Sequence, residues 1–197
     1  MAKKFRILAA ADLHGSVDIA KKLSEKAKKG KVDLVILAGD INGATEGDER
    51  ILLPFMKANQ KVAFIPGNWD FDKESLALKA HGKNIDNYYI SYGDIGIAGI
   101  GNANWKTNLK YEDFELLRAN FKRMKPKKRI LVSHVHAKGT MAEFSGFPGD
   151  KILRKAVEEF KPDLLISAHI HEAEGIEDKI GNTRIIQVGR NGTIIEV

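Results

Sequence analysis

The sequence predicts an α/β fold built on parallel strands, and three observations support that class. Short apolar runs such as Leu34–Ala38, which is bounded by Asp33 and Gly39, have the length of one buried strand. Amphipathic segments with helical spacing lie between successive runs. The polar residues that follow the first three runs recur at intervals of 28 residues. That interval matches one βαβ unit of roughly 30 residues.

In the first half of the chain, strands and helices are expected to alternate. The segment Val17–Lys29 illustrates the helical pattern, because Ile19, Leu23 and Ala27 fall on one face and lysines cover much of the rest. The expected elements are, in order, a strand at Phe5–Ala11, the helix Val17–Lys29, the strand Leu34–Ala38, a helix at Asp48–Lys57 with Pro54 near its start, the strand Val62–Ile65, and a helix from an N-cap at Asp72 to Lys79, with His81 capping its end.

The middle of the chain changes character. Tyr88–Tyr92 and Ile95–Ile100 flank Gly93-Asp94, a turn signal that predicts two adjacent antiparallel strands. The remaining expected elements are a helix at Tyr111–Arg123, a strand at Ile130–Val132, a helix at Lys151–Phe160, a strand at Leu164–Ile166, and short strands at Gly175–Ile180, Thr183–Val188 and Thr193–Val197. Because we find no repeat and no linker, we expect residues 1–197 to form one domain.

Composition excludes several classes of protein and site. The chain has no cysteine, so a disulfide framework, a thiolate metal site and a cysteine nucleophile are excluded. The apolar run after Met1-Ala2-Lys3-Lys4 is too short for a signal peptide or a membrane span, so we expect a cytoplasmic protein without a membrane partner. The net charge of +6 would suit a nucleic acid or a nucleotide. The lysine runs at 26–31 and 122–129 are more simply interpreted as solvated surface.

Polar residues of the kinds that bind metals follow the predicted strands. Ligands of open α/β sheets bind at the carboxyl ends of strands, so these residues should meet at one edge. Four of the six histidines of the chain belong to this set. The seven residues are Asp12, His14, Asp40, Asn68, His134, His169 and His171.

Taken singly, each of these residues has a plain structural interpretation. An Asp or Asn after a strand is often a turn or cap residue, and a His-x-His pair alone is weak evidence for a metal. Seven ligand-type residues at strand ends, with none inside a strand, are difficult to obtain from independent turns, so a metal site is the better hypothesis.

The ligand types narrow the metal. Imidazole and carboxylate without sulfur suit Mn, Fe, Zn or Ni, and argue against Mg or Ca alone. Seven ligands exceed what one ion with open positions requires, so we expect two divalent transition-metal ions that share one carboxylate. Two ions about 3.5–4 Å apart are the arrangement that hydrolyses phosphate esters, because a hydroxide between them can attack in line.

The same residues resemble a known family. Asp12-Leu13-His14, Gly39-Asp40-x-x-Gly43, Gly67-Asn68-Trp69-Asp70, Ser133-His134 and Ala168-His169-Ile170-His171 resemble, in order and spacing, the five motif blocks of the calcineurin-like metallophosphoesterases. The resemblance extends from about Phe5 to Gly189, and the tail is similar to the small Icc-related phosphoesterases. It implies a four-layer αββα sandwich, in which two mixed sheets are flanked by helices.

The resemblance also implies roles for the seven ligands. Asp12, His14 and His171 would hold one ion. Asn68, His134 and His169 would hold the other. Asp40 would bridge the two ions, and Asn68 would also contact the phosphate group of the substrate.

The sequence departs from the family pattern beside the site. Trp69 stands where many members have a histidine that serves as general acid, and an indole N–H cannot supply a proton at useful pH. We therefore expect a preference for phosphodiesters or a narrow set of substrates, with Trp69 stacking on the substrate or covering the site. His136 is a candidate substitute acid, although a solvated loop histidine is the simpler interpretation. The loop Ile100–Trp105 also differs from its usual form.

Three functions are compatible with the sequence. The leading hypothesis is a metal-dependent phosphodiesterase, with phosphomonoesters as additional substrates. A nuclease on DNA or RNA is favoured by charge and kinship, but no capping domain is evident. A non-catalytic protein-binding scaffold of the same fold is the third, and the complete ligand set argues against it. The physiological substrate, the native metal and the oligomeric state do not follow from the sequence.

Overall fold

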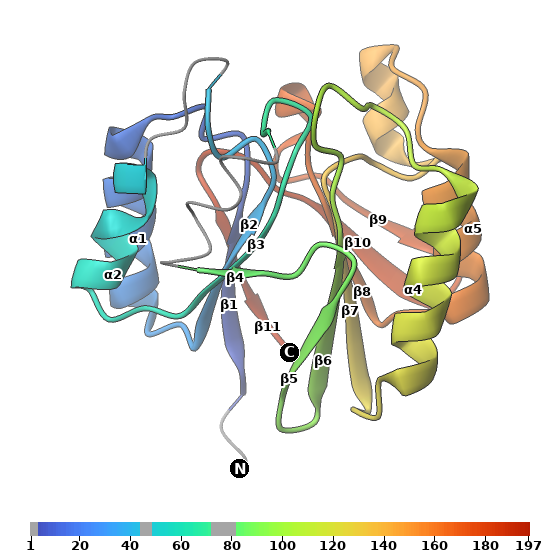
Figure 1. Ribbon diagram of the computed structural model, residues 1–197, viewed down its shortest axis with the longest axis horizontal. Coiled ribbons are helices and arrows are strands. Elements are labelled where there is room, and N and C mark those ends of the chain that lie inside the picture. Colours follow the sequence, from blue (N-terminus) through green and yellow to red (C-terminus); the bar gives the residue numbers. More distant parts are fainter. Residues whose placement is uncertain (1–3, 44–48, 72–81) are drawn as a thin grey trace.

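Four layers make up the computed structural model, which describes residues 4–43, 49–71 and 82–197 (Figure 1). Two sheets face each other, and helices cover both outer faces (Figure 1). Helices α1 (Val17–Gly30) and α2 (Leu53–Lys57) pack on one sheet, and α4 (Tyr111–Arg123) and α5 (Lys151–Phe160) pack on the other. The predicted αββα sandwich is confirmed. Within the described ranges, no helix combines the length and the apolar character that crossing a membrane requires.

The first sheet has the order β11-β1-β2-β3-β4. Its three central strands, β1, β2 and β3, are parallel neighbours, as the 28-residue spacing predicted. Every residue of β2 is buried, because the second sheet covers one face and helices cover the other. The strands are β1 (Arg6–Ala10), β2 (Leu34–Ala38), β3 (Val62–Ile65), β4 (Lys83–Asn84) and β11 (Thr193–Glu196), which is antiparallel to β1.

The second sheet has the order β5-β6-β7-β8-β10-β9. Strands β5 and β6 form the predicted antiparallel hairpin, and β6, β7, β8 and β10 are parallel. The strands are β5 (Tyr89–Tyr92), β6 (Ile95–Ile100), β7 (Lys128–Ser133), β8 (Leu164–Ser167), β9 (Glu177–Ile180) and β10 (Thr183–Gln187).

One expectation about the strand ends was wrong. His134 and His169 follow β7 and β8, and these strands belong to the second sheet, not to the sheet edge that carries Asp12 and Asp40. The two edges nevertheless meet, because His134 Nδ1 lies 2.8 Å from the carbonyl oxygen of Ala38 at the end of β2. The candidate residues therefore face one another across the top of the sandwich.

Short elements were the part of the fold that the sequence missed. The helix expected at Asp48–Lys57 is a 3₁₀ turn, η1 (Glu49–Leu52), followed by α2, which has Pro54 in its first turn as expected. The two-residue strand β4 was not anticipated, nor were the 3₁₀ turns η2 (Met141–Ser145) and η3 (His171–Ala173). Asp48, the helix expected from Asp72 to Lys79 and its cap His81 lie outside the described residues.

Three apolar clusters hold the layers together. One lies between the sheets, and the other two lie between each sheet and its helices. In the cluster under α4 and α5, Phe160 stacks on both Phe114 and Phe121, with ring centroids 5.2 Å and 5.1 Å apart. These contacts hold the outer helices against the sheets. The loops at the carboxyl ends of the strands are not needed for this packing and can carry polar groups.

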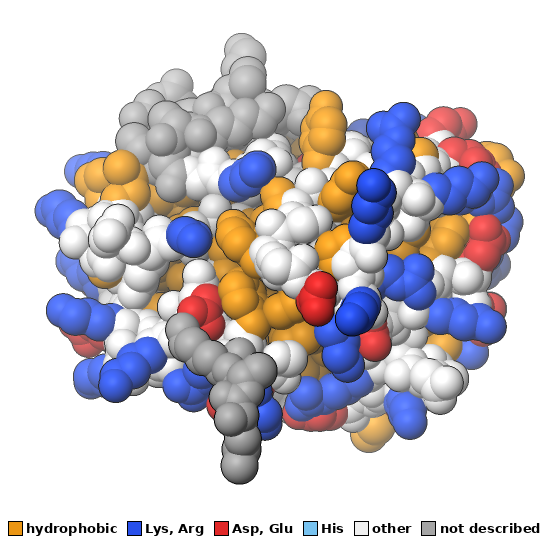
Figure 2. All heavy atoms as spheres, turned by 90° about the horizontal axis from the view of Figure 1, so that it is seen from below, with side chains coloured by type: hydrophobic (Ala, Val, Ile, Leu, Met, Phe, Trp, Pro, Cys, Tyr) orange, Lys and Arg blue, Asp and Glu red, His pale blue; other side chains and the backbone are white. Residues whose placement is uncertain are grey.

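The opposite end of the sandwich differs in character. Figure 2 shows this end, at the bottom of Figure 1, where Lys and Arg side chains surround an apolar centre and Asp and Glu lie among them. Lys122, Arg123 and Lys125, which open the second lysine run, are exposed. This distribution fits the interpretation of that run as solvated surface.

Candidate metal centre

Backbone strain is concentrated in the loops that follow the strands. Asp12, His14, Asp40 and His169 all have positive φ angles, of 57°, 46°, 50° and 71°. Residues other than glycine rarely adopt this left-handed conformation, and it persists where the surrounding structure or a function requires it. Four of the seven predicted ligands therefore share this uncommon backbone conformation.

Glycines allow the ligand-bearing loops to approach closely. A Cβ atom at Gly39 would lie 2.5 Å from Nδ1 of His134, and one at Gly67 would overlap the carboxylate of Asp40. The loops are also tied by backbone hydrogen bonds, because the N–H of His14 donates to the carbonyl of Asp40 over 2.9 Å. Glycine at these positions thus permits side chains from three loops to converge.

A first group of ligand-type side chains contains Asp12, His14 and His171. The Nε2 atoms of the two histidines lie 3.5 Å apart, and His171 Nε2 lies 3.7 Å from Oδ1 of Asp12. Asp12 is 1% exposed, and neither of its carboxylate oxygens has a hydrogen-bond partner among the described residues. Burial raises the pKa of Asp12 to about 6. A buried carboxylate without hydrogen bonds fits a site that a cation completes.

The second group contains Asp40, His134 and His169. His134 is fully buried, and its Nδ1–H can donate to the carbonyl of Ala38, which leaves Nε2 facing Oδ1 of Asn68 at 3.0 Å. Two acceptors at this distance require a proton or a metal ion between them. Burial disfavours the charge on His134, but the Asp40 carboxylate outweighs burial and raises the pKa of His134 to about 9.

His169 completes the second group in a different protonation state. Its ring lies edge-on to that of His134, with centroids 5.1 Å apart. Burial lowers the pKa of His169 to about 4, so its imidazole is neutral near pH 7 and offers a nitrogen lone pair. Near pH 7 the metal-free group therefore pairs a neutral imidazole with a charged one.

Asp40 lies between the two groups. Its Oδ1 accepts a hydrogen bond of 2.9 Å from the backbone N–H of Trp69. Its Oδ2 is 3.4 Å from Nε2 of His134 and 3.9 Å from Nε2 of His14. Burial acts to raise the pKa of Asp40, but the hydrogen bond and the charge of His134, together with the Trp69 N–H, outweigh burial and the pKa is lowered. One anionic oxygen is therefore directed at both groups.

The donor set fits metal ions. Within each group the candidate donor atoms lie within 4.8 Å of one another. Nitrogen and oxygen donors that share one transition-metal ion, each at about 2.1 Å, lie roughly 3–4 Å apart. The orphaned Asp12 carboxylate and the facing acceptors of His134 and Asn68 both call for positive charge. When bound, the ions would supply a Lewis acid and an activated water.

A protein-family model matches the part of the sequence that carries these groups. The model of the calcineurin-like phosphoesterases matches residues 5–173. The chain belongs to the calcineurin-like phosphoesterase family. It is thus a metallophosphoesterase, and the family supports its assignment as a phosphoric ester hydrolase.

Solved structures agree on the fold of this calcineurin-like phosphoesterase. TT1561 of Thermus thermophilus is 14% identical, with a TM-score of 0.76 over 96% of this chain and 91% of that one. A dimetal phosphatase from Danio rerio is 13% identical, with a TM-score of 0.67 and coverages of 96% and 88%. The phosphopantetheinyl hydrolase PptH from Mycobacterium tuberculosis is 13% identical, with a TM-score of 0.64 and coverages of 97% and 92%. No curated protein matches the chain.

Asp70 is a site residue that sequence reasoning did not assign. It is 1% exposed, and its carboxylate accepts backbone hydrogen bonds from Ile41, Asn42 and Gly67 over 3.1 Å, 2.8 Å and 2.8 Å. Asp70 thereby joins the loop after β2 to the loop after β3. Its position in the Gly67–Asp70 motif block was the sequence signal that could have identified it. Its hydrogen bonds to the loop after β2 could not be predicted, because they form only when the two loops come together in the fold.

Trp69 forms an aromatic wall with Trp105. The two rings have centroids 4.6 Å apart, and the ring of Trp69 lies edge-on to His14 at 5.7 Å. The backbone N–H of Trp105 donates to the carbonyl of Asn68 over 2.8 Å, so the loop that departs from the family pattern packs directly beside the site. Trp69 is 36% exposed and Trp105 is 52% exposed, so part of each ring is accessible to a substrate.

The interpretation of His136 as a solvated loop residue was wrong. His136 is 2% exposed, and its Nε2 lies 3.2 Å from the carbonyl oxygen of Phe147. Its own carbonyl accepts a hydrogen bond from the N–H of Asp150 over 2.8 Å, so the chain folds back over it. Burial lowers the pKa of His136.

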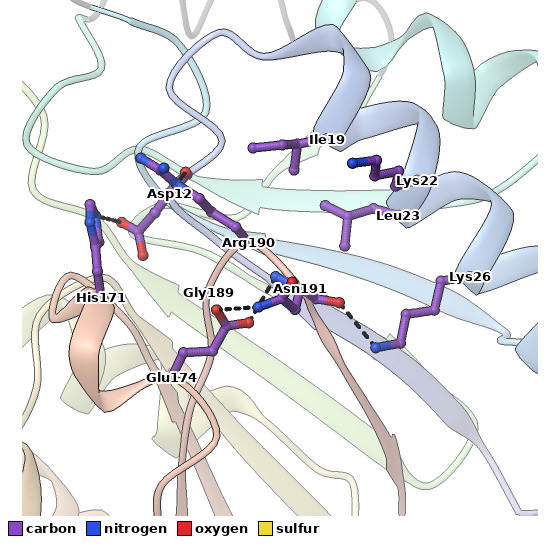
Figure 3. Close-up of a pocket in the computed structure, with 10 residues that line it drawn as sticks. All are labelled: Asp12, Ile19, Lys22, Leu23, Lys26, His171, Glu174, Gly189, Arg190 and Asn191. Atoms are coloured by element: carbon purple, nitrogen blue, oxygen red, sulfur yellow. Dashed lines mark hydrogen bonds and ion pairs between the residues drawn. The ribbon is translucent and has the colours of Figure 1, made fainter.

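Two cavities open on either side of His171. One, of about 450 Å³, is mostly apolar; its lining includes Val135, Phe147 and Ile170, the histidines His136, His169 and His171, and the acidic residues Asp150 and Glu172. The other, of about 490 Å³, contains Asp12 and His171 together with basic side chains of α1 and of the loop before β11 (Figure 3). The candidate metal centre therefore lies between an apolar recess and a basic one.

Proposed function

We propose that this chain is a dinuclear metal-dependent phosphodiesterase that hydrolyses phosphomonoesters less well. The observation that carries the proposal is the pair of cavities that share His171. A phosphodiester has two ester arms, and a phosphate seated on the metal centre would direct one arm into each cavity. A monoester would leave one cavity empty and lose the binding energy that the second arm contributes.

The distances support a proposed ligand assignment. Asp12, His14 and His171 would hold one ion, and His134, His169 and Asn68 would hold the other. Asp40 would be the shared ligand, because its Oδ2 lies 3.4 Å and 3.9 Å from one histidine of each group. Imidazole and carboxylate donors favour Mn, Fe, Zn or Ni. Manganese as the native ion and a cytoplasmic location stay predictions from the sequence.

The chain's own residues position the substrate. Because Oδ1 of Asn68 faces His134, its amide nitrogen is the group that donates to a phosphate oxygen. Trp69 and Trp105 cover one flank of the phosphate and offer ring faces to an organic arm. Phe147 and Ile170 supply an apolar wall for the arm on the other side.

We assign no side chain of this site as the general acid that would protonate the leaving group. His136 lines the apolar recess, but its Nε2–H is engaged by the carbonyl of Phe147 and its lowered pKa keeps it neutral. A missing general acid typically costs about 10²–10⁴-fold in rate. We therefore infer that the best substrates carry good leaving groups, and we assign no catalytic acid to His136.

The test compares a diester with the matching monoester. Metal-stripped protein is reconstituted with Mn²⁺ or Ni²⁺ and assayed with bis-p-nitrophenyl phosphate and with p-nitrophenyl phosphate. We expect kcat/KM for the diester to exceed that for the monoester by about tenfold, and Asp40→Asn to abolish both activities. If wild type and Asp40→Asn are equally inert with every metal, the enzymatic function is refuted. If the monoester is the better substrate, only the diester preference is refuted.

The scaffold alternative gains nothing from the structure. A protein-binding surface would not require a buried Asp12 without hydrogen bonds or four strained loop residues. The nuclease alternative receives one specific observation in its favour, the basic cavity beside Asp12.

A further inference from the structure

The basic cavity runs from the candidate metal centre to helix α1. Figure 3 shows Asp12 and His171 on one side of it and Lys22 and Lys26 on the other. Between them, Ile19 and Leu23 project from the same helix and form an apolar wall. The cavity of about 490 Å³ is large enough to hold a sugar with a phosphate attached. It therefore extends the proposed phosphate site in one defined direction.

Three cationic side chains surround this cavity. Arg190 is fixed against the metal centre, because its Nε–H donates to the backbone carbonyl of Asp12 over 2.8 Å. Lys26 is fixed at the far end, where its ammonium donates to the carbonyls of Asn191 and Gly192 over 3.0 Å and 2.8 Å. Lys22 makes no hydrogen bond to any residue that the structure describes. It is thus available to a ligand.

The acidic groups of the cavity form no ion pair with its two lysines. The carboxylate of Glu174 accepts hydrogen bonds from both the backbone N–H and the Nδ2 of Asn191, over 2.8 Å and 3.0 Å. It therefore serves to hold the turn that carries Arg190. The carboxylate of Asp12 faces His171 and the proposed ion. Among the residues that the structure describes, none forms an ion pair with Lys22 or Lys26.

We propose that this cavity binds a second phosphate of the substrate, carried on a sugar attached to the scissile phosphodiester. The inference rests on the proposed function, because it assumes that the scissile phosphate sits at the metal centre. The apolar wall of Ile19 and Leu23 packs against the sugar, and Lys22, Lys26 and Arg190 surround the second phosphate. The substrate class is a nucleotide-like diester with a further phosphate.

The kinetic test uses two esters that differ by one phosphate. These are the p-nitrophenyl ester of thymidine 5′-phosphate and the same ester with an added 3′-phosphate, and both release p-nitrophenolate. We expect the 3′-phosphate to lower KM about tenfold in the wild type, since exposed charge pairs each contribute modestly. In the Lys22→Met/Lys26→Met variant the two KM values should agree within about twofold.

A binding measurement separates this inference from the proposed function. Thymidine 3′,5′-bisphosphate and thymidine 5′-phosphate are titrated calorimetrically into metal-loaded wild type, the double variant and Lys29→Met, which removes an exposed lysine of α1 outside the cavity. We expect the bisphosphate to bind about tenfold more tightly to wild type and Lys29→Met, but not to the double variant. If neither ester is hydrolysed, the phosphodiesterase function is refuted. The titration still shows whether the cavity binds a second phosphate.

The second phosphate could come from a small nucleotide or from a nucleic acid strand, and a further arm distinguishes them. Ten-residue oligothymidylate is offered to the same variants. Cleavage that depends on the two lysines assigns the cavity to a strand, and cleavage of the small ester alone assigns it to a nucleotide. Equal affinity of wild type for the two thymidine phosphates, or a preference that the double variant retains, would overturn the proposal.

Discussion

Asp40→Asn should disturb both metal positions, whereas His171→Ala should disturb one. The side chain of Asp40 is the shared element, because its Oδ2 faces Nε2 of His134 at 3.4 Å and Nε2 of His14 at 3.9 Å. His171 belongs to the first group alone. We therefore expect the metal content to fall from two ions per chain to nearly none in Asp40→Asn, and to about one in His171→Ala.

The size of the effect follows from the charge that is removed. Two unit charges about 4 Å apart attract by about 4 kcal/mol at an effective dielectric constant of 20. Asparagine keeps the shape and the hydrogen bond from Trp69 but lacks this attraction. A loss of about 4 kcal/mol corresponds to roughly 10³-fold in affinity.

The assay is metal analysis by mass spectrometry after dialysis against a defined Mn²⁺ concentration, together with calorimetric titration of the metal-free proteins. Asp178→Asn is the matched control, because Asp178 lies on β9 and belongs to neither group. Circular dichroism of each metal-free variant establishes that it is folded. Retention of two ions by Asp40→Asn, or loss of both by His171→Ala, would refute the shared role of Asp40.

Three further outcomes are expected. In chelator, the raised pKa of His134, about 9 against an ordinary 6.5, contributes stability that is complete below pH 6.5 and lost as pH rises through 9; urea unfolding between pH 6 and 10 should show a decline of about 3 kcal/mol, and a flat profile would contradict it. Phe114→Ala should lower the free energy of unfolding by about 3–5 kcal/mol, against under about 0.5 for exposed Leu116→Ala, in the same urea assay. Trp69→Ala should raise KM for bis-p-nitrophenyl phosphate about fivefold to tenfold with little change in kcat, because it removes stacking and no reacting group; a fall in kcat alone would show that Trp69 does more.

The sequence was informative where a single local pattern determines the structure. Apolar runs of strand length, separated by one βαβ unit, were sufficient to place β1, β2 and β3 side by side. The pattern could not tell that β7 and β8 lie in a second sheet, because a strand buried on both faces has the same composition in either sheet. Strand β4 has two residues, too few for any periodicity.

The candidate site shows the same division. Asp12, Asp40 and His134 were selected by their positions after strands, and the structure places Asp12 in one group of candidate donors and Asp40 with His134 in the other. The burial of His136 could not be foreseen, because it depends on Phe147 and Asp150 returning over it. Such long-range packing leaves no signal near the residue itself.

The candidate donors of each group come from both sheets. Asp12 and His14 follow β1 in the first sheet, whereas His171 follows β8 in the second. Asp40 follows β2, and it is grouped with His134 from the end of β7. During synthesis, the amino-terminal half of the chain therefore emerges with only some of the candidate donors of each group. Metal loading of the proposed centre must follow translation of β8. Each bound ion would then link residues of the two halves and slow their separation.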